Sequence, residues 1–323
     1  MKTTNTKSAV KTQTGRSKLA SIVAGTAMSA ASLLGASFAR ATTITRQAGG
    51  QTTSWSDIAT TSSERISISD ATLTNPAGTL SRGDAFDGAL NVTLVSTAGS
   101  SDDAYIDPPG ASISNNSPNG GAVSGLASAS VNGTDIGVEW ALLFDSSAAQ
   151  VTGIFIVTNN SASTFDGFVD IYTNFGSDSS TVVEASSSGD ATIADGDSWV
   201  VTSEGSGESS GDDPVILSVI SNANALIGPG TDLNSGSDDL VWRVPVSLAP
   251  GANTTVTASH CLFETIAEAQ AAGVSGNCAA PIAPSGPAVA VPVMQNPALL
   301  ALAILTGLLG TGSLVGRRKK VQK

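Results

Sequence analysis

The sequence predicts an all-β, β-sandwich-like domain with one short helix. Apolar residues alternate with small or polar residues over several stretches, which is the period of a half-buried strand. Segments rich in Gly, Ser, Asp and Asn separate these stretches, as turns do. Away from the two ends of the chain, only one short segment is rich in helix-forming residues.

The first 41 residues are expected to form a signal peptide. A leader with five basic side chains precedes an apolar, small-residue-rich segment over 19–38. Ala39-Arg40-Ala41 then matches the A-x-A site of signal peptidase, so cleavage is expected after Ala41. The secretion machinery and signal peptidase are therefore expected partners. Because the basic leader is long, an uncleaved membrane anchor is the alternative.

The clearest strand spans residues 136–144, where five large apolar side chains recur at every second position. An apolar run over 153–158 follows a polar turn, and the two should form a hairpin. Pro245 lacks an N–H donor, which places its strand at a sheet edge or interrupts it. Residues 249–252 should form a type II turn. Further strands are expected at 65–69, 90–95, 168–173, 199–202, 215–220, 242–248 and 254–258.

Residues 264–272 are expected to form the helix, with Gly273 placed to end it. Cys261 and Cys278 flank this segment and are the only cysteines of the chain. Disulfides persist in exported proteins, so a structural disulfide is expected between them. Two free thiols are the alternative, since the sequence does not give the distance between them.

The C-terminal part predicts a linker and a membrane-spanning segment. A Pro/Ala-rich linker over 279–291 follows the acidic domain, which is expected over 42–278 as one large or two small β units. Residues 298–316 contain seven leucines and no charge, and at about 1.5 Å per residue they span roughly 28 Å as a helix. Arg317, Arg318, Lys319 and Lys320 follow at once and should stay cytoplasmic.

The order of elements in 292–323 resembles a class of bacterial sorting signal. Val291-Pro292, the apolar span and the basic cluster at 317–320 are similar to the tails of PEP-CTERM and IPTL-CTERM exported proteins. The resemblance implies processing by an exosortase-type peptidase and delivery to the cell surface. Val293 and Met294 depart from the Thr-Leu of the IPTL motif. A permanent anchor through 298–316 is the alternative, leaving the protein secreted, surface-located or membrane-anchored.

The charges are unevenly distributed along the chain. All 27 acidic side chains lie between the two ends, where Arg46, Arg65, Arg82 and Arg243 are the only basic ones, so the exported part carries a net charge of −23. Such a surface repels nucleic acid and excludes it as a partner. It could attract divalent cations, although simple solvation of a secreted domain explains it as well.

Calcium is the ligand that the acidic loops suit best, because Ca²⁺ takes six to eight oxygen ligands. The candidate residues are Asp195 and Asp197 in one loop, and Asp232, Asn234, Asp238 and Asp239 in another. Neither loop matches an EF-hand, so ordinary acidic turns are the alternative. No other cofactor is expected.

The sequence contains no convincing catalytic centre, and the chain is expected not to be an enzyme. His260 is the single histidine, and a structural role is expected for it. Glu139 and Asp170 could serve glycoside hydrolysis only if the fold brought them together. A structural or adhesive role at the cell surface or in the extracellular matrix is therefore expected. The alternative is a carbohydrate-binding module in which Trp55, Tyr105 or Trp199 stacks on sugar rings, with extracellular polysaccharide as partner.

Overall fold

The structure is a computed structural model that describes residues 42–58, 68–78, 81–97, 104–105, 112–177, 180–205, 213–222, 224–276 and 278. The predicted signal peptide with Ala39 and Ala41, the linker and the tail from Val291 to the basic cluster lie outside these residues. Within the described ranges, no helix is long and apolar enough to cross a bilayer.

The described chain is mostly β-strand, as the alternating pattern predicts. The strands are β1 (Thr42–Ala48), β2 (Gln51–Ile58), β3 (Asp70–Thr74), β4 (Ser81–Arg82), β5 (Phe86–Ser96), β6 (Ala104–Tyr105), β7 (Ser112–Asn115), β8 (Gly121–Val131), β9 (Thr134–Phe144), β10 (Gln150–Asn159), β11 (Phe165–Phe175), β12 (Thr181–Ser186), β13 (Trp199–Glu204), β14 (Val215–Ile220), β15 (Leu226–Ile227), β16 (Asp239–Leu248) and β17 (Asn253–Phe263). A 3₁₀ turn, η2 (Leu233–Ser235), and the helix α1 (Ile266–Ser275) complete the described elements.

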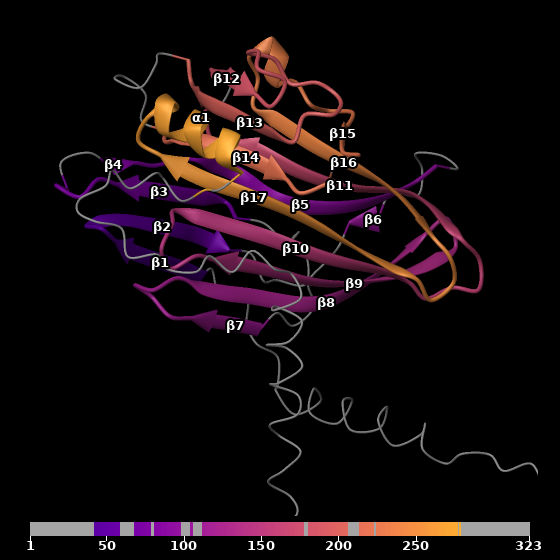
Figure 1. The fold of residues 1–323 in the computed structure, drawn as a ribbon. Coiled ribbons are helices and arrows are strands. Elements are labelled where there is room, and N and C mark those ends of the chain that lie inside the picture. The colour runs from indigo at the N-terminus through magenta and orange to yellow at the C-terminus, as the bar shows by residue number, and fades with distance from the viewer. Residues whose placement is uncertain are drawn as a thin grey trace, which may run out of the picture. The chain divides into compact units, whose positions relative to one another are not determined.

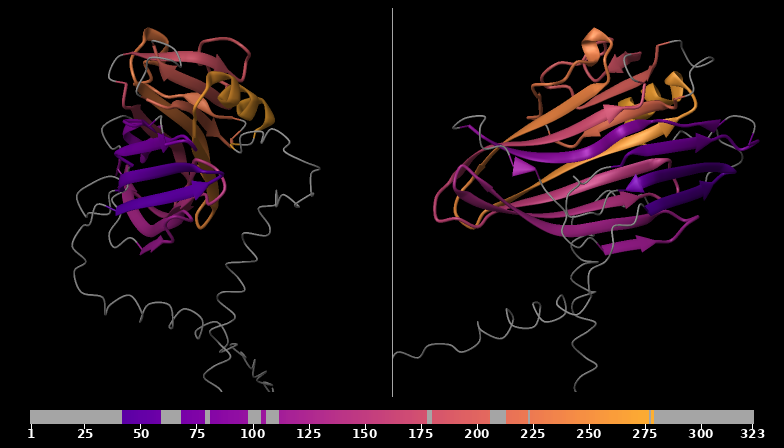
Figure 2. Two further views of the ribbon diagram at one scale, coloured as in Figure 1. Left: turned by 90° about the vertical axis from the view of Figure 1, so that its left-hand side faces the viewer. Right: turned by 180° about the vertical axis from the view of Figure 1, so that it is seen from behind.

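The strands form three antiparallel sheets (Figure 1). An eight-stranded sheet has the order β12-β13-β14-β17-β10-β9-β8-β7, and a five-stranded sheet has the order β15-β16-β11-β5-β6. A four-stranded sheet, β1-β2-β3-β4, faces the viewer in the left view of Figure 2. The all-β prediction is therefore confirmed.

One buried apolar cluster contains residues of all three sheets. Ile136, Val138, Trp140 and Leu142 of β9 point into it, and their neighbours point outward. From β11 it receives Val169 and Ile171. Trp55 connects the four-stranded sheet to the eight-stranded sheet, since its ring centroid lies 5.3 Å from that of Phe144. Sheets that share one core in this way form a sandwich-like arrangement.

The predicted hairpin and turns are confirmed. β9 and β10 pair in antiparallel register, with Trp140 opposite Phe155. Ala252 N–H donates to the Ala249 carbonyl at 2.9 Å, and Gly251 has a positive φ, as a type II turn requires. Pro245 lies beyond the short β15, which pairs only with Trp242 and Arg243 of β16. No described strand therefore requires an N–H donor from Pro245 on that side.

The helix begins at Ile266, later in the sequence than predicted, and Gly273 does not end it. The Thr265 side chain caps α1 by accepting from Glu268 N–H, and Gly276 ends the helix in the left-handed conformation. Gly273 is buried against Trp199, where an added Cβ would lie 2.9 Å from the indole ring. Close packing, not termination, therefore requires a glycine there.

A disulfide joins Cys261 to Cys278 with a Cα–Cα distance of 5.6 Å, as predicted. Both cysteines belong to a second apolar cluster, formed where α1 covers the outer side of β13, β14 and β17. The disulfide therefore ties the segment that follows the helix to the strand that precedes it.

Candidate functional site

An array of polar side chains lies on the outer side of β11 and β16. Val169 and Ile171 of β11, and Trp242 and Val244 of β16, point into the core. The alternate residues therefore point to the opposite side of the five-stranded sheet. We call six of these the outer strip: Phe168, Asp170, Tyr172, Asn174, Asp239 and Arg243.

Arg243 and Asp170 are directly opposite each other on the paired strands and form a two-point ion pair. Arg243 Nε donates to Asp170 Oδ1 at 2.8 Å, and Nη2 donates to Oδ2 at 2.5 Å. The Arg243 guanidinium also lies over the Phe168 ring, with Cζ 4.8 Å from its centroid. The two side chains are 18% and 11% exposed, so the pair is fixed but still reachable from solvent.

The other end of the outer strip is a hydrogen-bonded group of side chains. Tyr172 Oη donates to Asp239 Oδ1 at 2.5 Å, and Asn174 Nδ2 donates to the same oxygen at 2.9 Å. Asn174 Nδ2 also lies 3.2 Å from Asp238 Oδ2. Burial and the hydrogen bond to the Asp239 carboxylate raise the pKa of Tyr172 well above its usual value of 10. The phenol therefore remains a donor.

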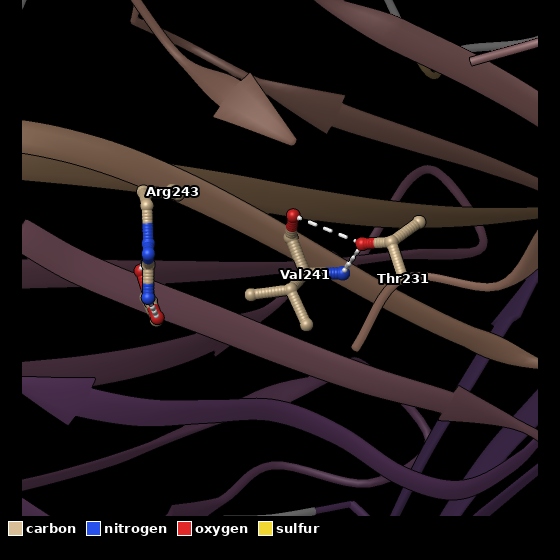
Figure 3. Close-up of polar contacts among 4 residues, drawn as sticks. Thr231, Val241 and Arg243 are labelled. Atoms are coloured by element: carbon tan, nitrogen blue, oxygen red, sulfur yellow. Dashed lines mark hydrogen bonds and ion pairs between the residues drawn. The ribbon is translucent and has the colours of Figure 1, made fainter. Parts of the chain in front are cut away.

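A loop from Gly228 to Asp238 holds β16 in place beside the strip. Thr231 Oγ1 accepts from Val241 N–H at 2.8 Å and also lies 3.4 Å from the Val241 carbonyl, as Figure 3 shows together with Arg243. Gly228 N–H donates to the Val241 carbonyl at 2.9 Å. A Cβ at Gly228 would lie 2.5 Å from the Val241 side chain, so only glycine permits this close approach.

Three carboxylates gather where this loop meets the strip. One carboxylate oxygen from each of Asp232, Asp238 and Asp239 lies within 4.8 Å of the other two, and all three residues are partly exposed. Asp239 N–H donates to Asp232 Oδ1 at 3.0 Å. Converging carboxylates of this kind could hold a metal ion, as predicted for this loop.

The other predicted calcium ligands have structural partners instead. Asn234 binds the backbone of Ile193 through both its amide oxygen and its amide nitrogen, each at 2.9 Å. Asp195 Oδ1 accepts from Ile227 N–H at 2.8 Å. Asp197 accepts from the backbone N–H groups of Ser188 and Ala194, at 2.8 and 2.9 Å. These side chains cap turns, and among the described residues they are not part of the carboxylate group.

The structure separates the two carboxylates considered for hydrolysis. Glu139 points outward from β9 in the eight-stranded sheet, whereas Asp170 points outward from β11 in the five-stranded sheet and pairs with Arg243. Core residues of both sheets lie between them. The two groups therefore cannot act on one glycosidic bond.

Two of the three predicted sugar-stacking aromatics, Trp55 and Trp199, pack against other parts of the protein. Trp55 is fully buried between two sheets, and Trp199 packs under α1 against Gly273. The side chain of Tyr105 lies outside the described residues. Phe168 and Tyr172 are the aromatic residues of the outer strip. The spacing of Phe168 and Tyr172 in Phe-Val-Asp-Ile-Tyr-Thr indicates that they share one face of a strand. The ion pair between Asp170 and Arg243, which belongs to a strand distant in the sequence, cannot be predicted from that pattern.

Neither a family model nor a curated protein sequence matches the chain. Several solved structures resemble the chain at low similarity. A galactose mutarotase-like protein from Lactobacillus casei is 11% identical with a TM-score of 0.40, covering 69% of this chain and all of that one. The aldose epimerase homologue from C. elegans is 8% identical with a TM-score of 0.39, covering 70% of this chain and all of that one.

A protein from Klebsiella pneumoniae described as an aldose 1-epimerase is 10% identical with a TM-score of 0.37, covering 53% of this chain. This chain spans 57% of the length of that protein. These findings contradict the prediction that the chain is not an enzyme, and that prediction is withdrawn. At these identities and TM-scores, the likenesses assign neither an activity nor a site residue to this chain.

Proposed function

We propose that this chain is an exported cell-surface or extracellular-matrix protein whose β-sandwich domain binds neutral polysaccharide through the outer strip. Binding of this kind would give the protein an adhesive role. The observation that carries the proposal is the arrangement of three side chains. The Phe168 ring lies beside Asp170 and Arg243, which hold each other in one geometry through their ion pair.

The chemistry of the strip suits sugar hydroxyl groups. Carboxylate, amide and guanidinium groups held in one geometry can exchange hydrogen bonds with neighbouring hydroxyls without first losing side-chain freedom. An aromatic side chain supplies an apolar surface for the C–H face of a sugar ring. Phe168, Asp170, Tyr172 and Asn174 follow one another at every second position of β11, about 6.8 Å apart, so they present a continuous row.

The charge of the strip indicates a neutral ligand. Asp170 already neutralises Arg243, and Asp238 and Asp239 add two further carboxylates at the other end. The exported part as a whole carries a net charge of −23. Uronic or sulfated saccharides would therefore be repelled, whereas neutral hexose polymers would not.

Replacing Phe168 by Ala should weaken binding of a neutral oligosaccharide about tenfold, which is the effect of losing about 1.4 kcal/mol of contact energy. Asp170→Asn should weaken it at least as much, because it removes the charge that fixes Arg243. A glycan array with neutral and acidic glycans would identify the ligand, and calorimetry would give the affinities.

The matched control is Asp135→Asn, an exposed carboxylate on β9 in the other sheet, which should leave affinity unchanged. Circular dichroism would confirm that each variant folds. If no glycan binds saturably, or if binding persists in the Phe168 and Asp170 variants, the outer strip is not a saccharide site.

We further propose that the cation suited to Asp232, Asp238 and Asp239 is Ca²⁺, with a structural role at the end of the strip. Binding would relieve repulsion among three carboxylates and would stabilise the folded state by mass action.

Calcium at millimolar concentration should raise Tm by several degrees, at about 2–4 °C per kcal/mol for a domain of this size. Asp238→Asn should abolish the shift, and Asp135→Asn should not; an equal shift in both variants contradicts the proposal.

Export and sorting are also proposals of ours. They rest on the A-x-A site at Ala39-Arg40-Ala41, the uncharged span 298–316 and the basic cluster behind it. We propose that signal peptidase removes the leader and that an exosortase-type peptidase removes the tail. The disulfide between Cys261 and Cys278 supports an oxidising destination.

A further inference from the structure

Among the described residues, α1 covers the outer side of the eight-stranded sheet over only part of its width. α1 packs over β13, β14 and β17, where it forms the second apolar cluster. The outward positions of the neighbouring strands β8, β9 and β10 lie beside this covered part in the same sheet. They form what we call the open face.

The middle of the open face is aliphatic, and the face carries few charges. Leu126 of β8 is 68% exposed, the second most exposed large apolar side chain among the described residues. Ala141 and Ile154 are opposite each other on β9 and β10, and Ile156 follows on the same side. Glu139, and Asp135 at the start of β9, are the charged outward side chains on these three strands. For a body with a net charge of −23, this is an unusual face.

On the open face, a protruding side chain lies beside a depression. A depression of about 310 Å³ is lined by Leu126, Glu139, Ala141, Ile154 and Ile156, together with Ser124. Leu126 stands at its border and is mostly exposed. A surface with both features can complement a second copy of itself around a two-fold axis. Each copy then supplies one protruding side chain and one depression that accepts the side chain of the other copy.

We propose that two copies of this chain associate through their open faces, with Leu126 of each copy entering the depression of the other. Two strongly acidic proteins repel each other least where the contacting surfaces carry few charges, and this favours association through the open face. Three strands about 4.8 Å apart and five outward positions about 6.8 Å apart give roughly 900 Å² of buried surface for the pair. That area is at the low end for specific complexes, so the dimer should be reversible and of micromolar affinity.

Sedimentation velocity tests this on the chain purified from an exporting host, at about 5 to 200 μM. We expect a concentration-dependent dimer that strengthens at least threefold when NaCl increases from about 20 to 300 mM, because salt screens like charges. Leu126→Asp should weaken association at least tenfold, by placing two carboxylates in the contact. Glu139→Gln should strengthen it, by removing two.

The matched control is Val274→Asp on α1, because Val274 is 80% exposed and lies outside the open face. It should dimerise like the wild type, and thermal melting would verify that all variants fold. A monomer at every concentration and salt level would overturn the proposal. A dimer insensitive to Leu126→Asp would overturn it too, since another surface would then be responsible.

Discussion

His260 shows how one residue can join the sheets of the sandwich. Its Nε2 lies 2.9 Å from Thr173 Oγ1 on β11, and its Nδ1 lies 2.9 Å from Ser218 Oγ on β14. The rings of Phe86 and Phe175 lie 5.1 and 6.3 Å away. Burial lowers the pKa of His260 from 6.5 to about 3, so the ring is neutral at physiological pH. A buried ring with both nitrogens occupied fits the expected structural role.

This pKa makes stability depend on pH in a defined direction. Between pH 6.5 and 3 the unfolded chain binds a proton at His260 that the folded protein does not, so stability is full above 6.5 and falls as pH decreases. From pH 7.5 to 5.0 the wild type should lose about 2 kcal/mol of unfolding free energy from this residue. Urea denaturation at the two pH values measures the loss.

His260→Gln should be less stable than the wild type at pH 7.5, but its unfolding free energy should change much less between the two pH values. Thr173→Val provides the comparison, because it removes one hydrogen bond yet retains the histidine, and it should keep the wild-type pH dependence. Equal pH dependence in His260→Gln and the wild type would show that other groups cause it.

At the scale of single elements, the sequence predicts strands best where one face is continuously apolar. Residues 136–144 are recognisable because every second side chain is large and buried. β1 and β2 were not predicted, because Arg46 and Thr53 share the buried positions with Ile44 and Trp55. Arg46 is tolerated there because it donates to Gln51 Oε1 and to the Ser147 carbonyl, both at 2.9 Å. Ser147 lies 101 residues further along the chain, so a local pattern cannot reveal that partner.

The same limit applies to the candidate site. The alternation in β11 predicts that Phe168, Asp170 and Tyr172 share one face, but not which strand lies beside them. The loop containing Asp232, Asp238 and Asp239 was predicted from its composition, and these three do converge. Asn234 does not join them, because its side-chain amide is hydrogen-bonded to the backbone N–H and carbonyl of Ile193.

The disulfide should contribute measurably to the stability of the α1 segment. Closing a loop of 17 residues stabilises a protein by about 3 kcal/mol in the chain-entropy model. Replacing both cysteines by Ala should therefore lower the unfolding free energy by about 2–4 kcal/mol, measured by chemical denaturation. Reductant should destabilise the wild type similarly and leave the double variant unchanged; a reductant effect on the double variant would point to another cause.

At the scale of the whole molecule, the sequence predicts the sandwich class but not its topology. β17 lies between β14 and β10, so strands far apart in the chain are neighbours. Nothing in the alternation of Thr254, Val256 and Ala258 specifies those partners, because the side-chain period is the same whichever strand pairs. Composition does predict the acidic character of residues 42–278, which depends on no strand pairing.

The ends of the mature protein test the proposed route across the membrane. Mass spectrometry of protein recovered from the cell surface should give Thr42 as the first residue and should lack the basic cluster 317–320. A variant with Ala39 and Ala41 both replaced by Leu should retain its leader, because signal peptidase requires small side chains there. Extracellular protein ending in an intact Lys323 would contradict processing of the tail.

The disulfide at Cys278 determines which part of the fold bears a mechanical force applied to the C-terminal part of the chain. Cys261 lies in β17, which is hydrogen-bonded to β14 on one side and to β10 on the other. Tension applied beyond Cys278 therefore passes through the sulfur atoms into a strand held along both edges, and residues 266–275 carry none of it. The helix can remain wound under a mechanical load that would otherwise unravel it first.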